Sequence, residues 1–132
     1  MDLEILKIAS NTDNNRNIKG HTHFSKLKNS LCGDEVKIKL IVKNNKIVDF
    51  GYQGKSCVYC QASVSLLSRI SLNNRIFEID KICDGAKNFF DDDLNKLEAN
   101  LKPFKKLLKK KNYFRKNCIL LPFKTLKKIV SN

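Results

Sequence analysis

The most restrictive feature of the sequence is a two-residue hydrophobic periodicity within residues 35–53. Apolar side chains alternate with lysines over 36–40, as in a strand with one buried and one solvated face. Two asparagines at 44–45 are a turn signal, and a second apolar stretch follows over 47–52. The pattern predicts an antiparallel β-hairpin, and the rest of the chain must cover its apolar face.

Helical spacing of apolar residues dominates elsewhere. The segment 11–30 is polar and is predicted to be a long loop. Asp91 to Asp93 offer N-terminal caps for the fourth helix, while Pro103 would divide it and Pro122 favours a late start, near residue 120, for the last one. The predicted helices cover residues 1–9, 59–71, 77–83 (ending near Gly85), 94–110 and 116–130. We therefore expect one α+β domain over residues 1–132, a small antiparallel sheet with helices packed on one face.

The chain contains five cysteines, at positions 32, 57, 60, 83 and 118. An odd number without a secretory signal pattern argues against a disulfide framework. No apolar run approaches the roughly 20 residues needed to cross a bilayer. We expect a cytoplasmic protein without membrane association, whose cysteines bind metal or carry sulfur.

Basic residues outnumber acidic ones by 26 to 13, for a net charge of +13. Such a charge can attract nucleic acid or an acidic protein. The positive residues are spread from Lys7 to Lys128 and match no nucleic-acid-binding motif. We interpret them as a solvated surface and expect no nucleic-acid partner.

Three of the cysteines occupy places where a loop or a helix start would present them. Cys32 precedes the predicted hairpin and Cys57 follows it, so strand pairing brings the two together, and Cys118 opens the last helix. Asp34 lies two residues after Cys32, and Gly33 lets the backbone turn both side chains toward one point. Three thiolates and one carboxylate suit tetrahedral zinc, and the thiolates also suit iron in a small cluster. A carboxylate is a weaker ligand than a fourth thiolate, so its presence would ease release of the bound metal.

Four segments together resemble the NifU/IscU/SufU family of U-type iron–sulfur cluster scaffolds. Residues 29–34 (NSLCGD) resemble the family's Asn-Pro-x-Cys-Gly-Asp motif, and residues 54–63 (GKSCVYCQAS) its Gly-x-Gly-Cys-x-x-x-x-Ala-Ser segment. Residues 115–118 (RKNC) resemble Arg-x-x-Cys, and residues 15–20 (NRNIKG) the Asn-Pro-Arg-Asn-x-Gly stretch. The matches occur in the family order and cover nearly the whole chain.

The resemblance implies a carrier rather than an enzyme. Cys32 would accept sulfur from a cysteine desulfurase, and Cys32, Cys57 and Cys118 would hold iron, with Asp34 completing the coordination of a [2Fe–2S] cluster for apo iron–sulfur proteins. The protein would be a monomer or a transient dimer. The chain has no Leu-Pro-Pro-Val-Lys stretch, and it carries Asn117 where the IscU type has a histidine ligand. In both respects it resembles the SufU type. That type leaves a second function open, a zinc-dependent sulfurtransferase that stimulates the desulfurase without building a cluster. A structural zinc module that binds nucleic acid is a third.

The chain departs from the family pattern at three positions. Ser30 replaces a proline, Ser56 replaces a glycine, and Cys60 replaces a serine. Cys57 and Cys60 form a Cys-x-x-Cys pair, so Cys60 is either an alternative ligand or redox partner, or a thiol that packs in place of the serine. Cys83 is expected in the core.

Arg115 either stabilises anionic sulfur close to Cys118 or is an ordinary surface charge. His21 and His23 are expected to be solvated.

Overall fold

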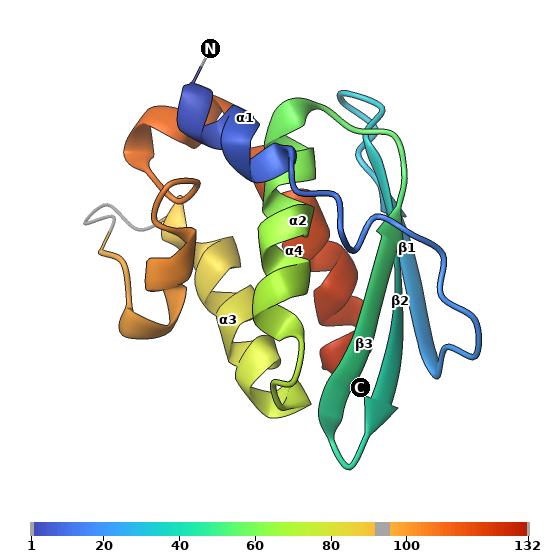
Figure 1. Cartoon of the computed structure of the whole chain (residues 1–132). Coiled ribbons are helices and arrows are strands. Elements are labelled where there is room, and N and C mark those ends of the chain that lie inside the picture. The colour runs from blue at the N-terminus through green and yellow to red at the C-terminus, as the bar shows by residue number, and fades with distance from the viewer. Residues whose placement is uncertain (1, 92–95, 132) are drawn as a thin grey trace.

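A three-stranded antiparallel sheet carries helices on one face, as the computed structural model shows for residues 2–91 and 96–131 (Figure 1). The strands, in sheet order, are β1 (His23–Lys28), β2 (Glu35–Lys43) and β3 (Lys46–Gln53). The α-helices are α1 (Leu3–Ala9), α2 (Val58–Ser71), α3 (Ile76–Phe89) and α4 (Lys116–Val130), and two 3₁₀ helices, η1 (Ala99–Phe104) and η2 (Lys110–Arg115), precede α4. The predicted α+β class is confirmed.

The predicted hairpin is formed by β2 and β3. Leu40 pairs with Phe50, and the ladder continues to Lys37 opposite Gln53. Asn44 and Asn45 both have positive φ, 53° and 63°, which matches the left-handed turn that favours a tight hairpin. Val36, Ile38 and Leu40 are buried beneath the helices, as their alternation with lysines predicts.

The expected loop over 11–30 is wrong in its second half, where β1 forms at the edge of the sheet. β1 pairs with β2 from His23 opposite Leu40 to Lys28 opposite Glu35. Its sequence, HFSKLK, gives almost no apolar alternation because Ser25 takes a buried position and Phe24 is half exposed on the outer side. An edge strand with a polar inner position carries little hydrophobic signal.

The helices cover the sheet in two layers. α4 lies against β1 and β2, α2 lies against β3, and α3 and α1 pack on α4 and α2 respectively (Figure 1). Fully buried side chains such as Phe50, Leu67 and Phe123 fill the space between sheet and helices. β3 ends opposite the start of β2, so α2 and Cys57 follow at that end of the sheet. The start of α4 lies there too, because Cys118 is close to Cys32 of the β1–β2 loop.

Two helix predictions need correction. α3 is longer than the expected 77–83 element and runs through Gly85, where a Cβ would lie 3.0 Å from Leu101 Cδ1, so glycine there permits close packing. The expected helix over 94–110 is replaced by η1, with Pro103 inside it, and by the start of η2; its first residues lie outside the described ones. The last helix, predicted over 116–130, is confirmed as α4, which runs through Pro122, so the alternative start near 120 is wrong.

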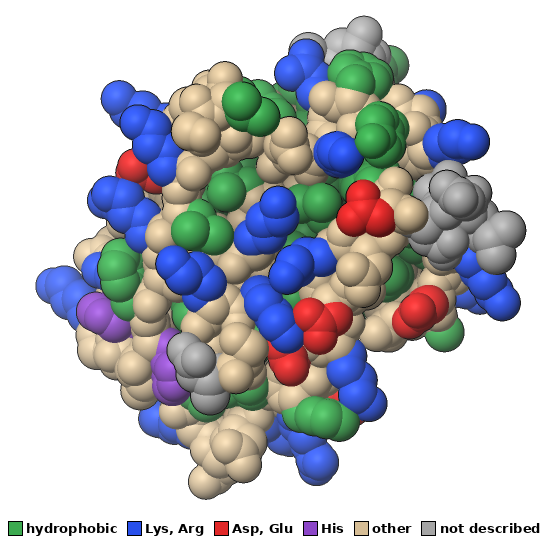
Figure 2. All heavy atoms as spheres, turned by 180° about the vertical axis from the view of Figure 1, so that it is seen from behind, with side chains coloured by type: hydrophobic (Ala, Val, Ile, Leu, Met, Phe, Trp, Pro, Cys, Tyr) green, Lys and Arg blue, Asp and Glu red, His purple; other side chains and the backbone are tan. Residues whose placement is uncertain are grey.

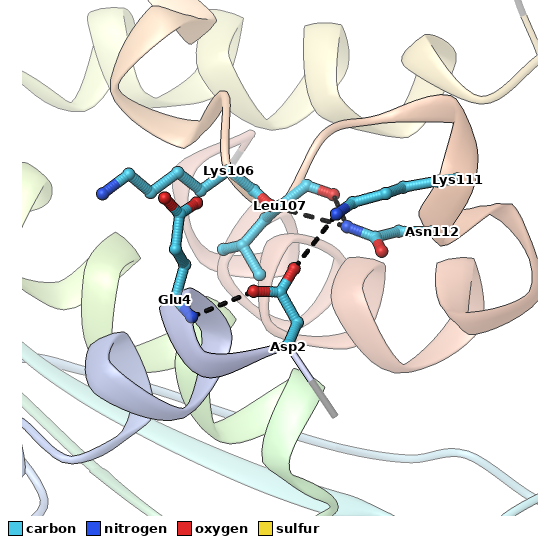
Figure 3. Close-up of polar contacts among 6 residues, drawn as sticks. All are labelled: Asp2, Glu4, Lys106, Leu107, Lys111 and Asn112. Atoms are coloured by element: carbon cyan, nitrogen blue, oxygen red, sulfur yellow. Dashed lines mark hydrogen bonds and ion pairs between the residues drawn. The ribbon is translucent and has the colours of Figure 1, made fainter.

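The segment before α4 is anchored to the N-terminal helix. Asp2 caps α1 by accepting from the Glu4 amide at 2.9 Å and also accepts from Lys111 Nζ at 3.3 Å (Figure 3). The Asn112 side chain donates to the Leu107 carbonyl at 2.9 Å. The contact between Asp2 and Lys111 joins α1 to η2, the element directly before α4, and the Asn112 contact fixes the turn that leads into it. Within the described residues, no helix is both long and apolar enough to span a bilayer.

Candidate metal centre

Two thiols and one carboxylate meet at the end of the sheet. One ligand atom from each of Cys32, Asp34 and Cys118 lies within 4.8 Å of the other two. The sulfurs of Cys32 and Cys118 are 4.0 Å apart and the cysteines are free. Two sulfurs bound tetrahedrally to one zinc ion, each at about 2.3 Å, would be about 3.8 Å apart. The spacing therefore fits a shared metal ion.

The loop between β1 and β2 presents Cys32 to solvent. The Asn29 amide donates to the Asp34 carbonyl at 2.7 Å, the Gly33 amide donates to the Asn29 carbonyl at 2.8 Å, and the Asn29 side chain accepts from the Leu31 amide at 3.0 Å. Gly33 has φ of +76°, a conformation that side chains disfavour. Asn29 thus organises the loop, and Gly33 turns the chain so that Cys32 and Asp34 face the same point.

Asp34 is buried, with 7% of its surface exposed. Its Oδ1 accepts from the Cys57 amide at 3.2 Å, while its buried Oδ2 has no hydrogen-bond partner among the described residues. A buried carboxylate oxygen without a donor is costly, and a cation would remove that cost. The chemistry of this donor set, two thiols and a carboxylate oxygen, fits zinc or iron.

A close crossing of two backbone segments holds Asp34 against Cys57. The Glu35 amide donates to the Lys55 carbonyl at 2.8 Å. A Cβ on Gly54 would lie only 2.0 Å from the Glu35 carbonyl oxygen, and its φ is +149°. Only glycine allows this approach, so Gly54 is part of the scaffold of the site.

Cys57 lies at the edge of the group. It is the N-cap residue of α2, its thiol makes no capping hydrogen bond, and it is half-buried. Burial raises the pKa of the Cys118 thiol, and the neighbouring Cys57 thiol raises this pKa further. The structure thus places Cys57 beside Cys118 but outside the tightest group of three.

Cys118 lies in the first turn of α4, with 6% of its surface exposed. Pro122, four residues later, has no N–H to donate to the Cys118 carbonyl. The buried hydroxyl of Ser63 on α2 donates to the next carbonyl, that of Ile119. The sequence analysis assigned no role to Ser63 or Asn29. Both residues lie inside the segments that resemble the family motifs, and this was the available signal.

The other predicted residues lie around this centre. Cys60 and Cys83 are completely buried, and burial raises the pKa of each thiol to about 12, which favours packing over ligation. The guanidinium of Arg115 lies 5.5 Å from the centre of the Tyr59 ring and 5.6 Å from that of Phe114. Its effect on the thiols stays a prediction. His23 begins β1, and His21 is exposed in the loop before it.

The sequence resembles known proteins along most of its length. Residues 4–91 match the model of the NifU-like N terminal domain. The iron–sulfur cluster assembly scaffold protein IscU of Thermotoga maritima is 35% identical over 101 residues, which make up 76% of this chain and 70% of the relative. A protein of Borreliella burgdorferi without an assigned function is 30% identical over 86% of this chain and 79% of its own length.

Solved structures share the fold of this chain. A protein described as a candidate iron–sulfur cluster assembly scaffold for the SUF system, from Fervidobacterium islandicum, superposes with a TM-score of 0.89 at 28% identity. The match covers 98% of this chain and 96% of that one. A NifU-like N-terminal protein from Brucella abortus shares the fold, with a TM-score of 0.83 at 21% identity over 98% of this chain and 91% of that one.

Proposed function

Because the chain belongs to the NifU-like N-terminal domain family of U-type iron–sulfur cluster assembly scaffolds, we propose that it accepts sulfur, binds iron and assembles a transferable [2Fe–2S] cluster. The membership predicted from the four motifs is confirmed, with a SUF-system protein among the structural relatives. The proposed ligands are Cys32, Asp34, Cys57 and Cys118, within a single domain over residues 1–132.

The observation that carries the proposal is the unpartnered Oδ2 of Asp34. This oxygen is buried, and Asp34 has a carboxylate oxygen within 4.8 Å of the Cys32 and Cys118 thiols, which no disulfide joins. A buried carboxylate oxygen that has no hydrogen-bond donor is suited to binding a metal ion. Because a carboxylate is a harder and weaker ligand than a thiolate for these metals, the same residue would ease the departure of the cargo.

The exposure of Cys32 supports its role as the sulfur acceptor. Its thiolate would attack the terminal sulfur of a persulfide on a cysteine desulfurase. A new S–S bond forms on Cys32, and the desulfurase cysteine leaves as a thiolate, so the transfer needs no external oxidant or reductant. Cys57 and Cys118, which are less exposed, would hold iron. A two-electron reductant such as a thiol would convert the Cys32 persulfide to sulfide and regenerate the Cys32 thiolate, and an apo iron–sulfur protein would receive the assembled cluster.

One observation favours a second candidate, a zinc-bound sulfur acceptor. The distance of 4.0 Å between the Cys32 and Cys118 sulfurs suits a single tetrahedral ion. In that function Cys32 would leave the zinc ion to take sulfur from the desulfurase, and no cluster would form.

The test is the iron, zinc and acid-labile sulfide content of the anaerobically purified protein and of its Cys32→Ala variant. Iron and sulfide in near-equal amounts, lost in the variant, would support the scaffold. Zinc without sulfide would support the sulfur acceptor, and desulfurase stimulation would then be measured. Cys83→Ala is the matched control, because Cys83 is a buried core cysteine distant in sequence from the proposed ligands. Loss of metal in both variants would indicate misfolding rather than ligand removal.

A further inference from the structure

The loop that presents Cys32 has a hollow on each side. A groove of about 250 Å³ lies between the loop and α4, and its lining includes Leu31, Leu121 and Lys124. A hollow of about 450 Å³ lies on the other side, over the start of β2, with Lys37 and Lys55 in its lining. Lys28 lines both. Cys32 lines neither hollow, but its chain neighbours Leu31 and Gly33 line one each, so a protein that covers the loop would contact both surfaces.

Both hollows are positively charged. Lys28, Lys37, Lys55 and Lys124 line them, and Glu35 is the only acidic residue among the described lining residues. Glu35 is itself paired with Lys26, at 3.6 Å, and no salt bridge is present for the four lysines within residues 2–91 and 96–131. We refer to Lys28, Lys37, Lys55 and Lys124 as the lysine collar.

The strand register brings a further lysine, Lys26, beside the collar and places Lys28 opposite Glu35. Lys26 and Lys37 are directly opposite one another on β1 and β2, an arrangement that is unfavourable for like charges. The face seen in Figure 2 carries many Lys and Arg side chains, with apolar side chains between them near its centre. The repulsion among these lysines would be relieved by a partner with negative charge.

An apolar contact accompanies the charge. Leu31, next to Cys32, is 83% exposed, and Leu27 and Leu121 line the adjacent groove. A small apolar centre with a charged rim is the usual composition of a protein–protein interface. Neither hollow has an aromatic lining residue on which a base could stack, among the described residues. The surface therefore fits a protein better than a nucleic acid.

We propose that the Cys32 loop and the lysine collar form the docking surface for a protein whose reactive cysteine is flanked by acidic residues. The acidic residues would contact the collar, an apolar residue would contact Leu31, and the partner's sulfur would thereby reach the Cys32 thiol. This inference rests on the proposed function, in which Cys32 exchanges sulfur with another protein. Opposite charges around the two thiols would raise their rate of encounter, an effect that salt screens.

The experiment uses three short peptides as probes. Each has one central cysteine, carried as a mixed disulfide with thionitrobenzoate, and the flanking residues are glutamates, glutamines or lysines. The Cys32 thiolate attacks the peptide sulfur, an S–S bond forms between Cys32 and the peptide, and thionitrobenzoate leaves as a coloured thiolate. The rate is measured on the metal-free full chain at low and high salt, and the rate of a Cys32→Ser variant is subtracted.

We expect the glutamate peptide to react about tenfold faster than the glutamine peptide at low salt, and the lysine peptide to react more slowly than both. High salt should bring the three rates together. Replacement of Lys28 and Lys124 by Glu should abolish or reverse the preference. Lys102 and Lys105 are two exposed lysines that line neither hollow. Their replacement by Glu makes the same change in net charge and should leave the preference for the glutamate peptide intact.

Equal rates for the three peptides at low salt would overturn the inference. So would an oligothymidylate that protects Cys32 at lower concentration than the free glutamate peptide, because the collar would then be a nucleic-acid surface. The result is separable from the metal assay. A protein that binds neither iron nor zinc yet prefers the glutamate peptide would contradict the proposed scaffold function and leave the docking surface in place.

Discussion

The hydroxyl of Ser63 donates a hydrogen bond of 2.6 Å to the carbonyl oxygen of Ile119, and both groups are buried. This bond joins α2, which begins immediately after Cys57, to α4, which carries Cys118 in its first turn. Since Pro122 has no N–H for the Cys118 carbonyl, the first turns of α4 lack one helical hydrogen bond. Ser63 therefore helps to hold the two cysteine-bearing helix ends in register.

Replacement of Ser63 by Ala should destabilise the metal-free protein by about 1–3 kcal/mol, because a buried hydrogen bond is lost. It should also weaken zinc or cobalt binding, since Cys57 and Cys118 would no longer be held together. Urea denaturation and competitive metal titration measure the two effects. Ser131→Ala is the matched control, because Ser131 Oγ donates to the Lys127 carbonyl of the same helix at an exposed site. Equal effects of the two variants on metal affinity would remove this role of Ser63.

Replacement of Asp34 by Ala should make an assembled cluster more persistent. The carboxylate is the hard, weakly held ligand of the proposed set, and the hydrogen bond from the Cys57 amide to its Oδ1 can stabilise it after it leaves the metal. The measurement is the half-life of the cluster when a chelator or an apo iron–sulfur protein is added. Asp13→Ala, at an exposed acidic residue, serves as the control. An unchanged half-life in the Asp34 variant would argue against a role in release.

The five cysteines should differ strongly in their rates of alkylation. Cys32 is exposed and should react first with iodoacetamide. Cys60 and Cys83 are buried, and their pKa values of about 12 leave almost no thiolate near neutral pH, so they should react only as the protein unfolds. Mass spectrometry of peptides after timed quenching measures the order. Bound zinc or a cluster should protect Cys32, and rapid labelling of Cys60 in the native protein would contradict its packing role.

The same pKa values predict a loss of stability at high pH. In the folded protein Cys60 and Cys83 keep their protons up to about pH 12, whereas in the unfolded chain they lose them above an ordinary pKa of about 8.5. The unfolded state then binds fewer protons, so the free energy of unfolding falls as pH rises between these values. Denaturation at several alkaline pH values should show this slope. A Cys60→Ala variant should reduce it, and an unchanged slope would contradict the buried state of this thiol.

The parts of the molecule that sequence predicted well are those with a strong repeating signal. The alternation over 36–40 predicted the hairpin that β2 and β3 form. The motifs around Cys32 and Cys118 identified two residues that the structure brings together with Asp34. β1 was missed because its inner position is occupied by Ser25 rather than by an apolar residue.

Several contacts that shape the site leave no pattern in the sequence. The bond from Ser63 reaches a backbone carbonyl 56 residues away, and the approach of Gly54 to Glu35 is set by how two loops cross. Backbone acceptors are present at every residue, so no local spacing identifies the one that is used. The structure was needed to find the parts that position the ligands, whereas the candidate ligands themselves were visible as residue types.

Gly54 provides the sharpest test of that positioning. In a Gly54→Ala variant the new methyl group would lie 2.0 Å from the Glu35 carbonyl oxygen, so β2 and the chain before α2 must separate. That movement would take Asp34 away from the Cys57 amide, and we expect at least about 2 kcal/mol of destabilisation together with weaker metal binding. Thermal denaturation and zinc titration measure the two.

Gly20→Ala separates this clash from simple backbone strain. Gly20 also has a positive φ, +74°, but nothing lies within 4 Å of the position of an added Cβ. The cost there should be limited to the strain of a left-handed backbone, about 1–2 kcal/mol, with metal affinity unchanged. If Gly54→Ala lowered stability no more than Gly20→Ala and left zinc affinity intact, the crossing of Gly54 and Glu35 would not be what holds Asp34 beside Cys57. A selective loss of metal affinity in the Gly54 variant would instead tie the metal centre to this backbone contact.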